Sequence, residues 1–505
     1  MSKLSVDLKK IISHSKEYGY IFPSSEIYDG LSACYDYGPF GVELKRNIKD
    51  YWWRSMVKSR LDVVGLDSSI FMHPGIWKAS GHVDAFNDPL IDNKDSKKRY
   101  RADQLIESYI EKLNSKIEKE VKKAHKRFGD KFDKDQFLQT SKRAQDYLNT
   151  ITKTTKLMNQ YLTEEDYGSL KKLIEEIGIV CPVSGTKNWT DIRKFNLMFS
   201  TKIGSVADQA TDLYLRPETA QGIFVNFLNV QKTARLKVPF GIAQIGKAFR
   251  NEIIARQFIF RMREFEQMEM QFFVRPGEEM KWFDYWKKER IKWHKKIGFS
   301  ENVLKFHDHE NLAHYANAAT DIEFKYPFGF KELEGIHSRT DFDLRSHEKH
   351  TNKKLQYFDS ELGESYTPYV IETSIGLDRM FLAVLCQSYT EELVKENTRI
   401  VLKIPPILAP IKVAILPLLK KDNLPEKSKD IYNRLNNFFS CYYEEKDSIG
   451  KRYRRQDALG TPFCVTVDHE TLDNNTVTLR NRDTMDQVRI SINDLIIQLN
   501  NKLSF

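Results

Sequence analysis

Arginine, phenylalanine, glutamine and glutamate occupy every second position from Arg261 to Gln271. Successive side chains of a β-strand point to opposite faces, so residues two positions apart share a face. As a strand, this segment would carry Arg261, Arg263, Phe265, Gln267, Glu269 and Gln271 on one face. Guanidinium groups bind anionic oxygens, and an aromatic ring stacks on another flat ring. The face therefore suits a polyanion that has a flat ring and a cationic end.

A hairpin is the element expected to hold these residues. Residues 246–274 contain two strand-like runs separated by a polar, arginine-containing connection, a pattern that predicts an antiparallel pair with a long loop. In the first run, Arg250 and Glu252 share a face. An edge hairpin with solvated charges is the simpler alternative, but it would leave Phe265 as a bare ring among charges. The opposite face of the second run carries Met262, Glu264, Glu266, Met268, Met270 and Phe272.

The hairpin also resembles a known motif. Phe249-Arg250-Asn251-Glu252, followed by Arg261 and Phe265, resembles motif 2 of the class II aminoacyl-tRNA synthetases. The resemblance implies a bent ATP, with Arg250 on its α-phosphate, Arg261 near its γ-phosphate and Phe265 under its adenine.

Residues 369–385 form a second segment of this kind. A short strand-like run ends near Gly376, and an apolar helical stripe follows it. Gly376-Leu377-Asp378-Arg379 resembles motif 3 of the same class, which implies that Arg379 meets the γ-phosphate. An arginine in the first turn of a helix is opposed by the helix dipole unless an anion lies nearby. That conflict favours a bound ligand over an internal salt bridge.

Glu332-Leu333-x-Gly335-Ile336 resembles the ATP-site strand of the family, where Glu332 would contact Mg²⁺ through ATP. Hard cations prefer oxygen ligands, and a charged edge strand is the alternative. The residues expected to bind ATP are Arg250, Asn251, Glu252, Phe260, Arg261, Met262, Arg263, Glu264, Phe265, Glu332, Leu333, Gly376, Leu377, Asp378 and Arg379, with Arg250 and Arg379 as the catalytic residues.

Two further segments resemble glycyl-tRNA synthetases in particular. Residues 80–107 contain Arg101, which the resemblance brings to the substrate, although a solvated basic patch is the default for this cluster. Residues 216–222, RPETAQG, contain Glu218, which it places on the ammonium of the amino acid. A desolvated cation requires such a carboxylate. The residues expected to bind glycine are Arg101, Glu218, Phe265, Glu266, Gln267, Met268, Glu269, Glu372, Thr373, Ser374, Ile375 and Gly376.

A chain of 505 residues is too long for a single core. The resemblance implies an α+β catalytic domain at 1–402, built on a mainly antiparallel sheet flanked by helices. Within it, a helical insertion is expected at about 103–195 and a second connection at about 276–330. Strands that alternate with helices predict a smaller α/β domain at 403–505. That domain resembles the anticodon-binding domain of the glycyl, histidyl, prolyl and threonyl enzymes, and its basic run 451–455 suits either an RNA contact or a solvated helix start.

Composition indicates which partners, cellular compartment and metal content to expect. The formal net charge of +9 permits a nucleic-acid partner without requiring one. No run of eighteen apolar residues predicts a membrane span, and the N-terminus lacks the features of a secretory signal, so a cytoplasmic protein is expected. Five dispersed cysteines fit reduced thiols. In CPVSG, Ser184 stands where many relatives have a cysteine after Cys181, so no structural zinc is expected.

A helix from Val42 followed by a strand that closes at Pro74 resembles motif 1, which builds the homodimer interface of the class; an ordinary surface helix is the alternative. Together, the motifs predict ATP-dependent attachment of glycine to tRNA(Gly) through a glycyl-adenylate. One alternative is a class II ligase for another small amino acid. Another is a catalytically inactive, glycyl-synthetase-like binding subunit. The inactive subunit should have lost Arg250, Arg261 and Arg379, all of which are present.

Overall fold

The computed structural model describes residues 7–129, 132–204, 211–253, 257–309, 312–313, 315–394 and 396–503. The chain forms two compact units. One consists of Met1–Ser80, Phe199–Arg250 and Ala255–Phe505, and the other of Gly81–Met198 with Asn251–Ile254. Within the described ranges, no helix combines the length and the apolar character needed to cross a membrane.

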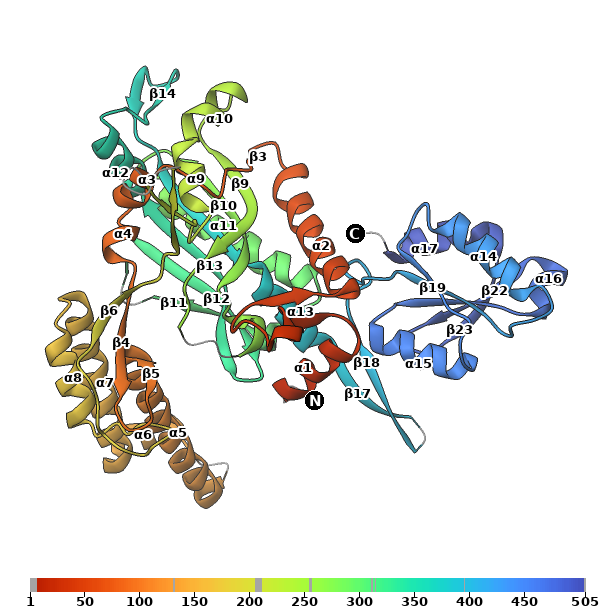
Figure 1. Cartoon of the computed structure of the whole chain (residues 1–505), viewed down its shortest axis with the longest axis horizontal. Coiled ribbons are helices and arrows are strands. Elements are labelled where there is room, and N and C mark those ends of the chain that lie inside the picture. The colour runs from red at the N-terminus through yellow and green to blue at the C-terminus, as the bar shows by residue number, and fades with distance from the viewer. Residues whose placement is uncertain are drawn as a thin grey trace. The chain divides into compact units, whose positions relative to one another are not determined.

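A seven-stranded sheet is the centre of the first unit (Figure 1), with the strand order β11-β12-β13-β16-β10-β9-β3. Its strands are β3 (Val63–Gly65), β9 (Phe240–Phe249), β10 (Glu264–Val274), β11 (Leu304–Asp308), β12 (Ala318–Tyr326), β13 (Gly329–Thr340) and β16 (Tyr369–Gly376). All neighbours are antiparallel except β3 and β9. The mainly antiparallel sheet predicted from the sequence is confirmed. Two strands of this sheet, β11 and β12, fall within the expected second connection.

Helices cover both faces of this sheet. On one face, α2 (Pro39–Trp53), α11 (Glu279–Lys296) and α13 (Leu377–Ser388) share a core with Met268, Met270 and Phe272 of β10. On the other face, α9 (Ala220–Val225) and α12 (Phe342–Thr351) pack on one end of the sheet through Phe224 and Leu344. The rest of this second face is polar; we call it the site face.

The β9–β10 hairpin expected from the sequence is present, and the alternation of its side chains holds from Glu264 onward. One detail differs: β10 begins at Glu264, so Arg261 and Arg263 precede the strand. A short 3-10 turn, Phe258–Phe260, comes before Arg261. The position of Arg261 therefore does not follow from strand alternation.

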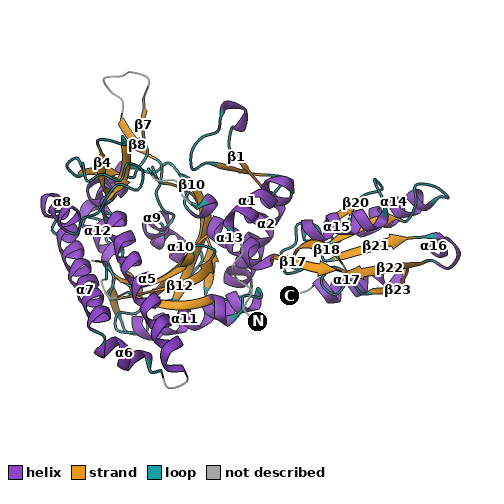
Figure 2. Ribbon diagram, turned by 90° about the horizontal axis from the view of Figure 1, so that it is seen from below, coloured by secondary structure: helices purple, strands orange, loops and turns teal. Residues whose placement is uncertain are grey.

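The second unit contains the helical insertion. Its helices α5 (Ala102–Phe128), α6 (Lys134–Thr140), α7 (Lys142–Thr163) and α8 (Tyr167–Glu176) lie side by side in Figures 1 and 2. α5, α7 and α8 share a core with a three-stranded sheet of β4 (Asn87–Asn93), β5 (Lys98–Arg101) and β6 (Arg193–Asn196). The expected range of 103–195 thus covers the helices but not β4 and β5, whose Ile91 and Tyr100 pack on them.

The C-terminal part of the first unit has its own five-stranded sheet, in the order β20-β19-β21-β22-β23. Its main core lies between one face of this sheet and the helices α14 (Leu424–Leu435) and α17 (Leu495–Leu503). On the other face, α15 (Ile449–Leu459) packs through Ile449 and Tyr453. The strands and helices are β19 (Val413–Pro417), α14 (Leu424–Leu435), β20 (Cys441–Tyr443), α15 (Ile449–Leu459), β21 (Phe463–Val467), α16 (His469–Asn474), β22 (Thr476–Asn481), β23 (Gln487–Ser491) and α17 (Leu495–Leu503). This is the α/β domain that the sequence predicts.

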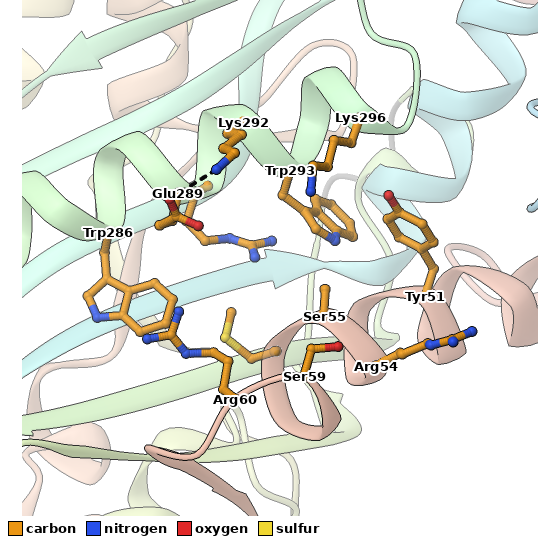
Figure 3. Close-up of a pocket in the computed structure, with 12 residues that line it drawn as sticks. Tyr51, Arg54, Ser55, Ser59, Arg60, Trp286, Glu289, Lys292, Trp293 and Lys296 are labelled. Atoms are coloured by element: carbon orange, nitrogen blue, oxygen red, sulfur yellow. Dashed lines mark ion pairs between the residues drawn. The ribbon is translucent and has the colours of Figure 1, made fainter. Parts of the chain in front are cut away.

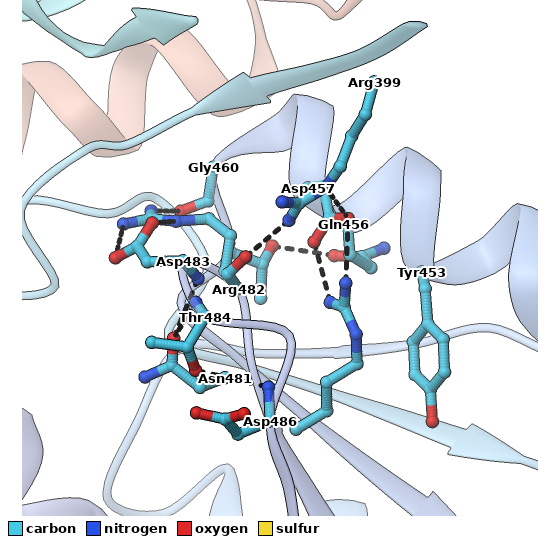
Figure 4. A network of polar contacts seen from close by, with 12 residues as sticks. Arg399, Tyr453, Gln456, Asp457, Gly460, Asn481, Arg482, Asp483, Thr484 and Asp486 are labelled. Carbon is cyan, nitrogen blue, oxygen red and sulfur yellow. Dashed lines mark hydrogen bonds and ion pairs between the residues drawn. The ribbon is translucent and has the colours of Figure 1, made fainter. Parts of the chain in front are cut away.

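Buried arginines join this domain to the hairpin of β17 (Tyr389–Val394) and β18 (Asn397–Leu402) (Figure 4). Arg399 of β18 donates to Asp457 of α15 at 2.9 Å and to the carbonyl oxygen of Arg482. Arg480 binds the same carboxylate with two hydrogen bonds, of 2.7 and 3.0 Å.

The shorter elements complete the first and second units. They are α1 (Leu8–Glu17), β1 (Ile21–Pro23), β2 (Tyr35–Tyr37), α3 (Pro74–Ala79), α4 (His82–Ala85), β7 (Ser200–Ile203), β8 (Thr211–Tyr214), α10 (Phe227–Thr233), β14 (Tyr357–Asp359) and β15 (Glu364–Tyr366).

Candidate active site

Carboxylates and amides from neighbouring strands meet on the site face. The register of β10 and β16 pairs Glu269 with Ser374 and Gln271 with Glu372, and β13 places His337 opposite Glu372. Directly opposed residues of an antiparallel pair share a face. The pairing therefore forms two adjacent polar rows across the middle of the sheet.

Glu269 and Glu372 are buried and close together. The side-chain Nε2 of Gln271 donates to Glu269 at 2.9 Å and to Glu372 at 2.8 Å. The Thr219 hydroxyl donates to the second oxygen of Glu269. Burial, together with the charges of Glu372 and Glu218, raises the pKa of Glu269 well above its usual range. A cation placed between these groups would relieve that repulsion.

Arg339 balances part of this negative charge. Its guanidinium donates to Asp343 at 2.8 and 3.0 Å and to Glu372 at 3.1 Å, while its plane lies 4.1 Å from the centre of the Tyr315 ring. His337 Nδ1 lies 2.8 Å from the other oxygen of Glu372. Burial alone would raise the pKa of Glu372, but the charge of Arg339 and the contact with His337 lower it overall.

Glu218 joins the same network from the loop before α9. Gln221 Nε2 donates to Glu218 at 2.9 Å and to Asp343 at 3.0 Å. Because Asp343 also binds Arg339, the network is continuous from Glu218 to Glu372. Glu218, Glu269 and Glu372 are far apart in sequence, yet the fold brings them into one cluster.

Arginines and aromatic rings lie near one end of the site face. Arg250 Nε donates to the carbonyl oxygen of Pro217 at 3.0 Å, and its guanidinium lies 5.3 Å from the centre of the Phe265 ring. Arg379 stacks 4.4 Å from the ring centre of Phe260 and forms a 2.9 Å ion pair with Glu332. In each of these pairs, a guanidinium thus lies against an aromatic ring.

A β-bulge sets the side on which Glu332 lies. In the β12–β13 register, Ile322 pairs with Glu334 and Glu323 pairs with Glu332, so Leu333 is an extra residue. Strict alternation would put Glu332 and Gly335 on opposite faces, but one extra residue puts both on the site face. Leu333 is instead buried in the core, while the side chain of Glu332 is 51% exposed.

Three family models of known proteins match parts of the chain. Residues 199–389 match the model of the tRNA synthetase class II core domain (G, H, P, S and T). Residues 88–197 match the glycyl-tRNA synthetase insertion domain 1, and residues 412–502 match the anticodon binding domain.

Curated relatives match over nearly their whole length. The glycine–tRNA ligase of Chlorobaculum tepidum is 50% identical, over 96% of this chain and 97% of its own. Those of Staphylococcus saprophyticus and Staphylococcus haemolyticus are each 48% identical, over 99% of this chain and 100% and 99% of their own. The chain belongs to the glycyl-tRNA synthetase family.

As a glycyl-tRNA synthetase family member, the chain has the class II fold that motifs 2 and 3 implied, and that prediction is confirmed. The structure separates the predicted glycine-site residues by face. Gln267, Glu269, Glu372 and Ser374 lie on the site face, whereas Met268, Thr373 and Ile375 alternate to the buried core side. Glu266 also turns away, toward Lys45 and Lys49 of α2 at 2.7 and 3.2 Å.

The predicted ATP-site residues are similarly divided. Phe260 and Met262 are buried, and Leu377 is buried within the core at the start of α13. Gly376 is the N-cap residue of that helix. Arg263 donates to the carbonyl oxygen of Ser32 at 3.2 Å, and Glu264 pairs with Lys247.

Three predicted residues belong to the second unit. Arg101 forms ion pairs with Asp88 at 2.9 Å and with Asp103 at 2.6 Å. Arg101 is therefore ion-paired within the second unit and 21% exposed, and the substrate contact implied by the resemblance stays a prediction. Asn251 donates its backbone N–H to Leu197 at 2.7 Å, and Glu252 follows it in the chain.

Hydrogen-bonding groups surround the sulfur of Cys181. The Cys181 sulfur lies 3.3 Å from the Ser96 hydroxyl and 3.2 Å from the Tyr100 hydroxyl, and it accepts the backbone N–H of Val183 at 3.4 Å and of Ser184 at 3.5 Å. Across the described ranges, no three His, Cys, Asp or Glu side chains are grouped so as to hold a metal ion.

Several polar residues of the site were missed by sequence reasoning. Thr219 and Gln221 lie within the quoted RPETAQG run, so their neighbourhood gave a usable signal. Gln271 continued the alternation but carried no charge that marked it. Arg339 and Asp343 are four residues apart, a common spacing for an ion pair, and nothing local distinguishes them from a surface pair.

A separate cavity of about 360 Å³ lies on the core side of the sheet (Figure 3). Tyr51 and Arg60 line it from the α2 segment, and Trp286 and Trp293 line it from α11. It contains none of the residues predicted for the ATP or glycine sites.

Proposed function

We propose that this protein attaches glycine to tRNA(Gly) in an ATP-dependent reaction that passes through a glycyl-adenylate. The observation that carries the proposal is the buried carboxylate cluster of Glu218, Glu269 and Glu372, with Arg250 at the end of β9 and with Arg379 paired to Glu332 of the same face. The relatives described above bear the name glycine–tRNA ligase, which supports the same reaction.

The carboxylate cluster suits the ammonium of an amino acid. Its carboxylates outnumber its positively charged side chains, since the one guanidinium of Arg339 pairs with both Asp343 and Glu372. An ammonium would bind Glu269 and Glu372, with Glu218 and Ser374 nearby, and satisfy the desolvation requirement of a buried cation. Glycine selection would follow from excluding larger side chains at the α-carbon, because a missing side chain offers no contact.

ATP would lie along the row of arginines and rings. Arg250 would move from the Phe265 ring to the α-phosphate, and the adenine would take the place of its guanidinium on that ring. Arg261 and Arg379 would hold the β- and γ-phosphates. The half-exposed carboxylate of Glu332 has the hard oxygens that suit Mg²⁺. When bound with ATP, Mg²⁺ supplies positive charge to the triphosphate.

The first step forms a bond between a glycine carboxylate oxygen and the α-phosphorus and breaks the bond between that phosphorus and the bridging oxygen to the β-phosphate. Pyrophosphate leaves, and Arg250 stabilises the charge that develops on the α-phosphate. In the second step, a terminal ribose hydroxyl of tRNA attacks the glycyl carbonyl, and AMP leaves. The contribution of the protein is positioning and electrostatics.

A homodimer interface would form through α2 and β3.

The C-terminal domain would bind the tRNA anticodon. Within its basic run, residues 451–455, Arg452 is buried and donates to the carbonyl oxygens of Pro417 and Leu418. Lys451 and Arg454 are exposed, so these two are the residues of the run proposed to contact RNA. Single-stranded bases are read through stacking and their unpaired edges.

Pyrophosphate exchange with glycine, alanine and serine tests the reaction. We expect exchange with glycine and little with the others. A preference for alanine or serine would support a class II ligase for another small amino acid. Binding of tRNA without any exchange would support the inactive binding subunit. The variant R379A should lose exchange, because it removes a phosphate contact while leaving the carboxylate cluster intact.

A further inference from the structure

The side chain of Asp378 lies on the core side of the sheet, not on the site face. Its side chain is only 3% exposed. Oδ1 accepts the Tyr37 hydroxyl and, at 2.9 Å, Lys45 Nζ. Oδ2 accepts the backbone N–H of Glu266 at 2.8 Å. A buried carboxylate with these partners is out of reach of a ligand, so the predicted ATP-site residue Asp378 acts on ATP through other residues.

The N–H of Glu266 is a group that strand pairing leaves without a partner. β10 and β16 pair as far as Gln267 and Gly376, where the chain turns into α13. The carboxylate of Asp378 takes the place of the carbonyl that a longer β16 would offer. An unpaired buried N–H is costly. This contact therefore ties the start of β10 to the first turn of α13.

Lys45 of α2 pairs with both Asp378 and Glu266 on the core side of the sheet. Its ammonium lies 2.7 Å from Glu266 and 2.9 Å from Asp378, and its side chain is 12% exposed. It also lies 4.0 Å from the centre of the Tyr37 ring. Burial alone would lower the pKa of Lys45, but the charges of Asp378 and Glu266 raise it overall. Removing one member of such a buried group leaves the others uncompensated.

We propose that Asp378 and Lys45 are positioning residues for the adenylation site and fix the places of Phe265 and Arg379. Phe265 immediately precedes Glu266, whose N–H and carboxylate they hold. Arg379 immediately follows Asp378. The inference rests on the proposed function, because that function assigns Phe265 to adenine and Arg379 to the triphosphate.

The variant K45M tests the proposal, since methionine has a similar length and no charge. Misplacing a binding group by about 1 Å can cost about 100-fold in rate. In glycine-dependent pyrophosphate exchange, we expect kcat/KM for ATP to fall about 100-fold, with the KM for glycine changed by no more than about twofold. A lower melting temperature with an unchanged kcat/KM for ATP would overturn the proposal.

K49M is the matched control. Lys49 lies one helical turn away on α2, pairs with Glu266 at 3.2 Å, and is 30% exposed. Its loss should change kcat/KM for ATP by no more than about twofold. Equal effects of K49M and K45M would contradict a specific role for Lys45. Absence of glycine-dependent exchange in the wild-type protein would count against the proposed function, and so is distinguishable from a failure of the positioning proposal.

The double variant K45M/D378N provides a second measurement, which tests whether Lys45 and Asp378 act together. The amide introduced by D378N would keep an oxygen for the Glu266 N–H, and the cluster would lose one positive and one negative charge. We expect the double variant to exceed, by about tenfold, the activity obtained by multiplying the effects of K45M and D378N. Simple multiplication of the two effects would show that Lys45 and Asp378 do not act together, and would overturn the proposal.

Discussion

Glu269 and Glu372 accept hydrogen bonds from the same nitrogen, Nε2 of Gln271, at 2.9 and 2.8 Å. Arg339 and His337 contact only Glu372 of this pair. Glu372 is therefore held in its ionised form, and the ionisation of Glu269 depends on what else occupies the site. A substrate ammonium would supply Glu269 with the positive charge that Arg339 supplies to Glu372.

The binding of glycine should consequently weaken in acid. Below its raised pKa, Glu269 is neutral and cannot pair with an ammonium, so affinity should increase as the pH rises through that pKa. The KM for glycine in pyrophosphate exchange, measured as a function of pH over the range in which the protein stays folded, checks this expectation. E269Q should raise the KM by about 10- to 100-fold and remove this pH dependence. A wild-type KM that is constant over the range would contradict the assignment.

The same raised pKa affects folding stability. A group whose pKa is higher in the folded state favours folding while it is protonated, and that contribution is lost as the pH rises through the folded-state value. E269Q cannot ionise and avoids this loss. We therefore expect E269Q to melt at a higher temperature than the wild type, with the difference growing as the pH increases. Equal melting temperatures across the pH range would argue against the buried repulsion.

Arg339 should be the strongest stabilising residue of the cluster. R339K keeps the charge but cannot make the two parallel hydrogen bonds to Asp343. Breaking a buried ion pair costs about 3–5 kcal/mol, and we expect R339K to lose about 3 kcal/mol of the free energy of unfolding in urea. R345K is the control, because Arg345 pairs with Asp341 at the same spacing but is 62% exposed. Similar losses in both variants would contradict the expectation.

The sequence predicted the parts of the site that depend on local alternation. From Glu264 onward, the period of two places Gln267 and Glu269 together and sends Met268 to the core. It also separates Glu266 from Glu269, although the resemblance assigned both to glycine. Resemblance identifies segments, whereas the face occupied by each residue within a segment requires the strand register.

Other features depend on contacts between distant segments. The bulge at Leu333 turns Glu332 to the site face, and no residue type near it marks an extra residue. Lys45 and Asp378 meet only after α2 and α13 pack on the same side of the sheet. Buried pairs of this kind are formed by tertiary packing, so a single sequence offers no local signal for them.

Asp457 should hold the C-terminal domain to the β17–β18 hairpin. D457N would leave Arg399 and Arg480, both almost fully buried, without their shared carboxylate. We expect it to lower the free energy of unfolding by about 3–5 kcal/mol. Limited proteolysis should also cut the junction near residue 403 more rapidly. D422N is the control, because Asp422 is 45% exposed and its partners His469 and Lys421 are 54% and 69% exposed, so its loss should cost less than about 1 kcal/mol. Equal protease resistance of D457N and the wild type would contradict this role.

Gly246 should tolerate no side chain, because Arg216 occupies the space above it. A Cβ at Gly246 would lie 2.2 Å from Arg216 Nη2. Arg216 cannot readily move away: it is 2% exposed and donates to the carbonyl oxygens of Lys247 and Ser68 at 2.6 and 2.7 Å. G246A must therefore displace a buried guanidinium beside Gln267, the residue opposite Gly246 in the register.

We expect G246A to lower glycine-dependent exchange by about 100-fold, since a displacement of about 1 Å in a site has effects of that size. G450A is the matched control, because no atom lies within 4 Å of a Cβ at that position. It should leave exchange within about twofold of the wild type, as surface substitutions commonly do. If G246A exchanged as fast as G450A, Arg216 would have space to move, and the packing of RPETAQG against β9 would be looser than the structure indicates.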